Sequence, residues 1–371
     1  MVVSDTEKFG EPMERGMRNG SGKHIVWSNE RIYVRRRRRT AVIGVMSAAA
    51  VGICIGAGAV GIQYDVRSAM QDVVGQSKVR QSQERVKSDT ATDAATAVNP
   101  TQTALAGINA LDGGATVSTT GFTLDTDSQL AIESQIGNFE SVGYTVSFVL
   151  ADVTTGRAMA YNADTQIYSA SAIKAPYLMA LASSGAIDVN AVYQASDEQT
   201  AALKHDIDQV LTISDNASYA RIHEQYGYDS FNTWAQQAGA TTQMAEYGGY
   251  AYTSARDMAK LWSAGYGVLF DHQTSGAAAI SDEALQWLSG DMTDSLNSSI
   301  HSALGDANTV YTKAGWINGD GDFYALNDGG IVASSAGNYV LTVMSDACGR
   351  SDLMTDLVST LDSVHAGVMQ G

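Results

Sequence analysis

The 371-residue sequence has few of the residues that cross-link or interrupt a chain, with only three prolines and two cysteines. Three prolines without a period exclude a collagen-like or proline-rich architecture. Two cysteines are too few for a disulfide-stapled small domain or a cysteine-rich zinc protein. The six histidines lie far apart, and none has the paired spacing of a zinc site. Because 44% of the residues are hydrophobic, we expect one or two folded domains that hold no metal or other cofactor.

Positive charge is scarce beyond the first part of the chain. Residues 1–67 contain eleven Lys and Arg against six Asp and Glu, a net charge of +5. Residues 68–371 contain twelve against thirty-four, a net charge of −22. Phosphate contacts need a basic surface, so the acidic part excludes nucleic acid as a partner.

The basic N-terminal part ends in a long apolar run. Residues 35–39 are five arginines, and the 23 residues 40–62 contain no charged residue. About 20 helical residues cross a bilayer core, and arginines at one end hold that end in the cytoplasm. The sequence therefore predicts a basic cytoplasmic tail over 1–39, a single transmembrane helix over 40–62 in the cell membrane, and an extracytoplasmic remainder. A cleaved signal peptide is the alternative, although its tail and apolar run are usually shorter.

The remainder divides into a stalk and a folded domain. Residues 63–126 are predicted to be an extracytoplasmic stalk, because 88–120 is rich in small and polar residues that cannot bury a core. Apolar residues alternate over 144–150, as in a half-buried strand, and the segment 338–345 (NYVLTVMS) also has a strand pattern. The sequence between them is mostly helical in pattern. We expect one α+β domain over 127–371, with an antiparallel sheet formed by both ends of the domain and a helical lobe between them.

The first candidate for chemistry is the pair Ser171-x-x-Lys174. Residues i and i+3 share a helix face, so Lys174 can reach the Ser171 hydroxyl. A serine is a poor nucleophile until a base takes its proton, and a lysine is such a base only where burial or another cation lowers its pKa. The signal is weak alone, but no other such pair occurs in the sequence.

Two further motifs follow. Ser-Asp-Asn at 214–216 stands before a helical pattern, where its polar residues could simply cap the helix. Lys-Ala-Gly at 313–315 follows a β-rich run, and a glycine beside a lysine on an edge strand lets backbone amides approach a ligand closely. Each motif alone has an ordinary structural explanation, whereas the order of the three is far more specific.

In this order, the three motifs resemble those of class A β-lactamases and penicillin-binding proteins. Residues 127–371 are similar to this serine hydrolase family beyond the motifs. A hairpin around 155–156 leads into Ser171, the stretch 253–259 (TSARDMA) resembles the helix start after the family's Ω-loop, and 327–332 (NDGGIV) resembles its penultimate strand. The resemblance implies a β-lactamase/transpeptidase-like fold.

The resemblance also implies catalytic roles for four residues. Ser171 would attack a carbonyl and form an acyl-enzyme. Lys174 would accept the Ser171 proton, and the nearby Lys313 would lower the Lys174 pKa. Ser214 would relay a proton to the departing amide nitrogen.

Substrate binding is implied for neighbouring positions. Asn216 would hold the side-chain amide of the substrate, and Lys313 would attract its carboxylate. Ala314 and Gly315 would line the substrate, and the backbone amides of Ser171 and Trp316 would form the oxyanion hole.

The sequence departs from the family pattern at two places. Ala314 stands where many members have Thr or Ser, which removes a hydroxyl bond to the substrate carboxylate worth on the order of 1 kcal/mol or more. The family's deacylating Glu has no clear counterpart. The stretch 240–252 holds one acid, Glu246, which is either the water-activating base or a solvated loop carboxylate. Without a base, acylation proceeds while hydrolysis is slow.

Two classes of function stay open. The first is a membrane-anchored serine hydrolase that reacts with β-lactams or a related, peptidoglycan-like amide or ester through Ser171 and deacylates slowly. The second is a degenerate, non-catalytic domain that binds a cell-envelope ligand or partner. The intact Ser171, Lys174, Ser214 and Lys313 favour the first class, while Ala314 and the missing Glu favour the second. A Ser-His-Asp hydrolase is disfavoured because the sequence has no GxSxG motif.

Overall fold

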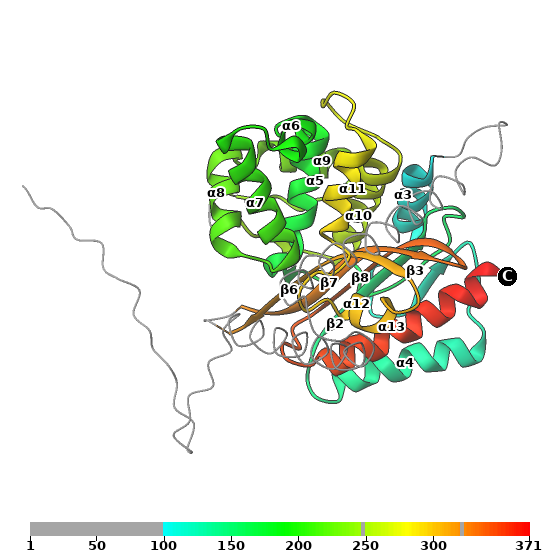
Figure 1. Ribbon diagram of the computed structural model, residues 1–371. Helices are drawn as coiled ribbons and strands as arrows, with labels where there is room; N and C mark the ends of the chain where they lie inside the picture. Colours follow the sequence, from blue (N-terminus) through cyan, green and yellow to red (C-terminus); the bar gives the residue numbers. More distant parts are fainter. Residues whose placement is uncertain (1–98, 246–248, 320–322) are drawn as a thin grey trace, which may run out of the picture. The chain divides into compact units, whose positions relative to one another are not determined.

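The structure is a computed structural model that describes residues 99–245, 249–319 and 323–371 (Figure 1). These residues all belong to one compact unit of the chain, 60–371. Within the described ranges, no helix has both the length and the apolar composition that crossing a membrane requires. The predicted tail, the predicted transmembrane helix over 40–62 and the stalk up to residue 98 lie outside the described residues.

A six-stranded antiparallel sheet forms the centre of the fold, in the order β1-β3-β2-β8-β7-β6. The strands are β1 (Ser118–Thr120), β2 (Val146–Asp152), β3 (Ala158–Tyr161), β6 (Thr309–Asn318), β7 (Tyr324–Ser334) and β8 (Gly337–Ser345). Strand β2 pairs with β8 in the middle of the sheet, from Val146 opposite Ser345 to Asp152 opposite Tyr339. The expectation that both ends of the domain share one antiparallel sheet is therefore confirmed, and β6 is an edge strand.

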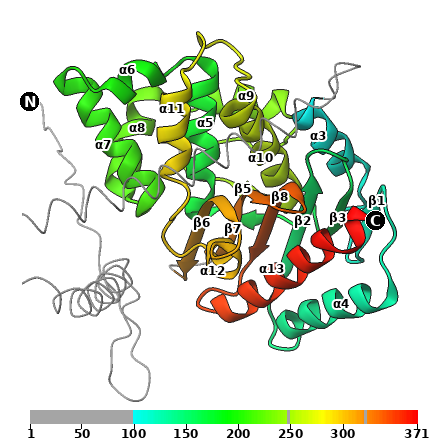
Figure 2. The same cartoon turned by 45° about the vertical axis from the view of Figure 1, so that its right-hand side comes forward.

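Helices cover both faces of this sheet (Figures 1 and 2). On one face, α4 (Thr126–Glu140), α12 (Ser299–Leu304) and α13 (Ser351–Ala366) pack against Phe148 and Leu150 of β2. On the other face, α3 (Pro100–Ala110) and α10 (Ala255–Phe270) pack against Val149 and Ala151. Every residue of β2 is consequently buried, so the prediction of a half-buried strand over 144–150 was wrong.

The helical lobe lies between β4 and β6 in the sequence. It contains α5 (Lys174–Ser184), α6 (Val189–Gln194), α7 (Glu198–Thr212), α8 (Asn216–Tyr226), α9 (Asp229–Gln237) and α11 (Asp282–Gly290). The short strands β4 (Ile167–Tyr168) and β5 (Tyr252–Thr253) pair with each other where this lobe meets the sheet. Two single turns, η1 (Ala170–Ile173) and η2 (Val368–Gln370), complete the described elements.

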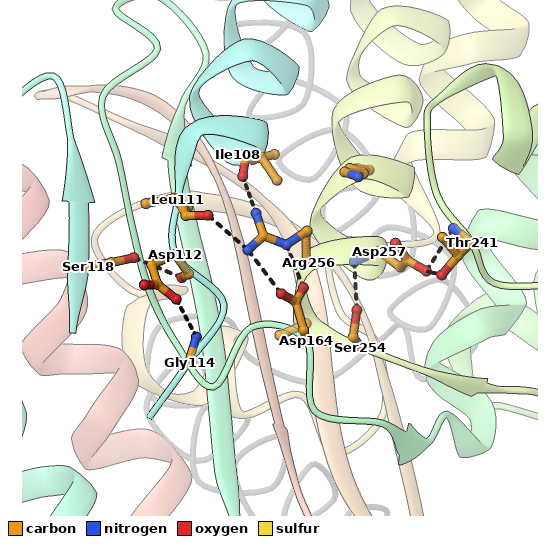
Figure 3. Close-up of polar contacts among 12 residues, drawn as sticks. Ile108, Leu111, Asp112, Gly114, Ser118, Asp164, Thr241, Ser254, Arg256 and Asp257 are labelled. Atoms are coloured by element: carbon orange, nitrogen blue, oxygen red, sulfur yellow. Dashed lines mark hydrogen bonds and ion pairs between the residues drawn. The ribbon is translucent and has the colours of Figure 1, made fainter. Parts of the chain in front are cut away.

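The folded domain begins before residue 127, which corrects the predicted stalk boundary. Helix α3 is capped by Asn99 and buries Ala104 and Ile108. Figure 3 shows Arg256 of α10 donating hydrogen bonds to the carbonyl oxygens of Ile108 and Leu111 at the end of α3. The same guanidinium pairs with Asp164.

The stalk was predicted because this segment has few large apolar residues. Its small side chains instead allow the helix to pack closely against a neighbouring segment. A Cβ added at Gly107 of α3 would lie 2.1 Å from the carbonyl oxygen of Gly156. A helix of small side chains can therefore sit directly on the backbone of a hairpin, with few large apolar groups.

Candidate active site

Ser171 lies in the single turn η1, between β4 and α5, and is half-buried. Ala170, directly before it, has φ +44°, a left-handed conformation that is costly for a residue with a Cβ. Asn327 of β7 donates from its amide nitrogen to the carbonyl oxygens of Tyr168 (2.8 Å) and Ser169 (3.0 Å). The sheet thereby holds the turn that presents Ser171.

Edge strand β6 passes directly beside this turn at Gly315. A Cβ added at Gly315 would lie 2.2 Å from the backbone nitrogen of Ala172 and 2.7 Å from that of Ser171. Only glycine permits this approach. The sequence predicted a close approach to a ligand at this glycine, whereas the structure shows a close approach to the Ser171 turn. The close approach brings the neighbouring Trp316 backbone to the Ser171 turn.

Lys174 joins the first motif to the second. It is the first residue of α5 and is fully buried. Its Nζ donates to the carbonyl oxygen of Ser214 (2.9 Å) and to Oδ1 of Asn216 (2.7 Å). Burial lowers the pKa of Lys174 to about 6, and the charge of Lys313 acts in the same direction. At pH 7 the amine is therefore mostly neutral and can act as a base.

Lys313 is the second buried amine of the site. Burial lowers its pKa to about 7, although the nearby carboxyl of Asp328 on β7 acts to raise that pKa. Its Nζ donates to the carbonyl oxygen of Ala314 (2.9 Å) and lies 6.0 Å from the ring centroid of the half-buried Trp316. The methyl group of Ala314 is itself buried, at 1% exposure. Lys313 thus supplies a titratable positive charge beside the Gly315 contact.

Ser214 carries the third buried polar group of the site. Its φ is +63° and its hydroxyl, buried with the residue at 1% exposure, has no hydrogen-bond partner among the described residues. Buried hydroxyls are rarely left unpaired, so this one is free to serve a bound molecule. Asp215 instead has the structural role left open by the sequence, because its carboxylate accepts from the backbone nitrogen of Ser218 at the start of α8.

Tyr250 is the site residue that the sequence analysis missed. Its hydroxyl donates to Oδ1 of Asn216 (3.1 Å), and its ring packs against those of Tyr168 and Tyr219, with centroids 5.9 and 5.6 Å away. No motif marks this position. The sequence indicates only that a tyrosine lies in the stretch 240–252, close to the predicted acid of that stretch. Glu246 lies outside the described residues, so its role stays a prediction.

The structure therefore gathers residues from all three motifs. Lys174 contacts Ser214 and Asn216, and Tyr250 contacts Asn216. The 313–316 segment reaches the Ser171 turn through Gly315. Within the described parts of the chain, no group of three or more His, Cys, Asp or Glu side chains could hold a metal ion.

Comparison with known proteins shows which family and fold the chain resembles. The family described as the beta-lactamase enzyme family matches residues 131–361. A β-lactamase from Sphaerobacter thermophilus is 17% identical, with a TM-score of 0.51 over 66% of this chain and 98% of that chain. A β-lactamase from Burkholderia vietnamiensis is 18% identical, with a TM-score of 0.50 over 66% and 98%.

A third similar structure is a point mutant of PBP-A, in an acyl-enzyme complex with penicillin G. It is 18% identical, with a TM-score of 0.50 over 63% of this chain and 96% of that chain. At these identities the structures show a shared fold, and no curated protein sequence matches the chain. The family match itself spans more than half of the sequence, and the chain therefore belongs to the beta-lactamase enzyme family of β-lactamase-like and penicillin-binding serine hydrolases.

Proposed function

We propose that this domain is an extracytoplasmic, membrane-anchored serine hydrolase that forms an acyl-enzyme at Ser171 with β-lactams or with a related, peptidoglycan-like amide or ester. One observation carries the proposal. Lys174 is buried, has a pKa lowered to about 6, and donates to the backbone of the Ser-Asp-Asn motif. Lys174 follows Ser171 by three residues, and a neutral amine is the kind of base that this nucleophile needs.

Acylation forms a bond between Ser171 and the substrate and breaks one bond of the substrate. The Ser171 oxygen attacks the carbonyl carbon, and Lys174 takes the hydroxyl proton. The carbon–nitrogen bond of the substrate breaks, and the unpartnered Ser214 hydroxyl passes its proton to the departing nitrogen while Lys174 returns the Ser171 proton to Ser214. The backbone amides of Ser171 and Trp316 stabilise the negative charge that develops on the carbonyl oxygen.

The same residues favour a substrate that carries a carboxylate and a side-chain amide. Lys313 is a fully buried residue of the edge strand β6, so its positive charge is weakly screened and attracts an anion strongly. Asn216 has an exposed side chain whose oxygen is occupied by Lys174, which leaves its amide nitrogen to bind a substrate carbonyl. The penicillin G complex of PBP-A, a protein of the same fold, supports β-lactams as the first compounds to test.

Deacylation is expected to be slow. In the described ranges, the hydrogen bonds of Lys174 and Tyr250 go to carbonyl and amide oxygens and to no carboxylate. Hydrolysis of an acyl-enzyme needs a base that activates water. Glu246 is our candidate for that base. If Glu246 is instead a solvated loop carboxylate, the acyl-enzyme should be long-lived.

A non-catalytic, ligand-binding domain is the second candidate function. The buried methyl group of Ala314 favours it, because that position offers the substrate carboxylate no hydroxyl. The two functions differ in whether Ser171 forms a covalent bond.

The deciding experiment exposes the detergent-solubilised full chain to a fluorescent penicillin. We expect one label for each chain, its loss in Ser171→Ala, and persistence of the label for minutes or longer after excess penicillin is removed. Ser359→Ala, an exposed serine of α13, is the matched control and should label normally. Normal labelling of Ser171→Ala would show that Ser171 is not the nucleophile. Rapid loss of the label from the wild-type chain would make Glu246→Gln the next variant.

A further inference from the structure

Tyr250 lies where three elements of the site converge. Its hydroxyl donates to Oδ1 of Asn216 at 3.1 Å, the same atom that accepts from Lys174 at 2.7 Å. The side chain of Ser171 lies near the same phenol and acts to lower its pKa. A phenol can donate one hydrogen bond while its oxygen accepts another, so the Tyr250 oxygen is able to accept from Ser171 while it donates to Asn216.

The surrounding structure fixes this tyrosine in place. Its neighbour Gly249 has φ +70°, and a Cβ there would lie 2.8 Å from the His223 ring. The hydroxyl of the buried Tyr219 donates to the carbonyl oxygen of Gly249 at 2.5 Å. The rings of Tyr168 and Tyr219 both contact the Tyr250 ring. The phenol is therefore held from its backbone and from its ring.

We propose that Tyr250 is a positioning residue for acyl transfer, whose hydroxyl holds the Ser171 hydroxyl in line with the Asn216 amide. The inference rests on the proposed function and adds a group that none of the three motifs contains. With Oδ1 of Asn216 occupied by two donors, the amide nitrogen is turned toward the substrate side, and the Ser171 hydroxyl is kept in one rotamer.

The protonation of the phenol agrees with this role. Burial raises the pKa of Tyr250 to about 12, and the nearby Ser171 side chain opposes that shift only in part. The hydroxyl therefore stays protonated at neutral pH and keeps donating to Asn216. A neutral phenol is also a poor base, so Tyr250 orients the nucleophile and does not activate water.

The test is Tyr250→Phe in the full chain, with the labelling rate measured against the concentration of fluorescent penicillin. We expect the maximal acylation rate to fall about five- to tenfold, the range of one hydrogen bond. The half-saturating concentration should change less than about twofold, because Lys174 still holds Asn216. A merely structural role would instead lower the thermal unfolding midpoint and the labelled fraction together.

Tyr252→Phe is the matched control, since Tyr252 contacts the same Tyr168 ring, at 5.7 Å, and is 54% exposed. It should label at the wild-type rate. A Tyr250→Phe rate within about twofold of wild type, or an equal fall in Tyr252→Phe, overturns the proposal.

A second probe separates this inference from the proposed function. A fluorophosphonate forms a phosphorus–oxygen bond with an activated serine and releases fluoride, without any β-lactam. A wild-type chain that reacts at Ser171 with this probe but not with penicillin overturns the β-lactam proposal, and the same five- to tenfold fall in Tyr250→Phe then supports the positioning role. A wild-type chain inert to both probes overturns both.

Discussion

In the proposed reaction, the protonation of Lys174 and Lys313 controls when Ser171 reacts. Burial lowers the pKa of Lys174 to about 6 and that of Lys313 to about 7. Below its pKa, Lys174 is a cation and cannot accept a proton. Above its pKa, Lys313 is neutral and cannot attract a carboxylate. The two requirements oppose each other along the pH axis.

We therefore expect two separate pH dependences in penicillin labelling. The maximal labelling rate should rise with pH through about 6 and level off above about 7, as Lys174 becomes neutral. The half-saturating concentration should rise above about pH 7, as Lys313 loses its charge. Rates measured from pH 4.5 to 9 at several penicillin concentrations separate the two, and a maximal rate that is flat between pH 5 and 7 would contradict the role of Lys174.

At the scale of residues, the sequence predicted which residues belong to the site but not the tertiary contacts that they make. The Ser-x-x-Lys spacing predicted a lysine near the serine, because i and i+3 share a helix face. The spacing could not reveal that Lys174 contacts Asn216, 42 positions away. Tyr250 was missed for the same reason, since its partners come from η1 and α8, which are distant in the sequence.

At the scale of elements, the contact between β6 and η1 depends on Gly315. We expect Gly315→Ala to reduce penicillin labelling at least about tenfold, because its Cβ would meet backbone atoms that cannot move without displacing Ser171. Labelling rates together with thermal unfolding check this expectation. Gly137→Ala, in α4 with nothing within 4 Å of the added Cβ, is the control and should be neutral or more stable by about 0.5–1 kcal/mol.

Helix α3 depends on Arg256 in a similar way. Arg256→Ala removes a charged donor from two carbonyl oxygens at the end of that helix, so the free energy of unfolding should fall by about 2–3 kcal/mol. Urea denaturation measures this loss. The control is Arg350→Ala, whose pair with Asp352 is exposed, so the loss of stability should be much smaller. Equal losses in both variants would refute the anchoring role of Arg256.

At the scale of the whole molecule, the N-terminal 62 residues are proposed to anchor the domain. We expect the full chain to remain in the membrane pellet after alkaline washing, because 23 uncharged residues suffice to span a bilayer core. A chain that begins at residue 63 should be found in the soluble fraction. Recovery of the full chain in the soluble fraction would contradict the anchor, and a shortened N-terminus would indicate the cleaved signal peptide instead.

The sequence by itself determined the fold class, the order of the three motifs and the family, because each depends on local periodicity or on residues within a few positions of one another. Tertiary structure decided the rest. Small residues of α3 are buried only because a hairpin and Arg256 come to them from elsewhere in the chain. The low pKa of Lys174 and the placement of Tyr250 arise from burial among segments more than 30 positions apart, and burial of that kind has no signature in a linear pattern.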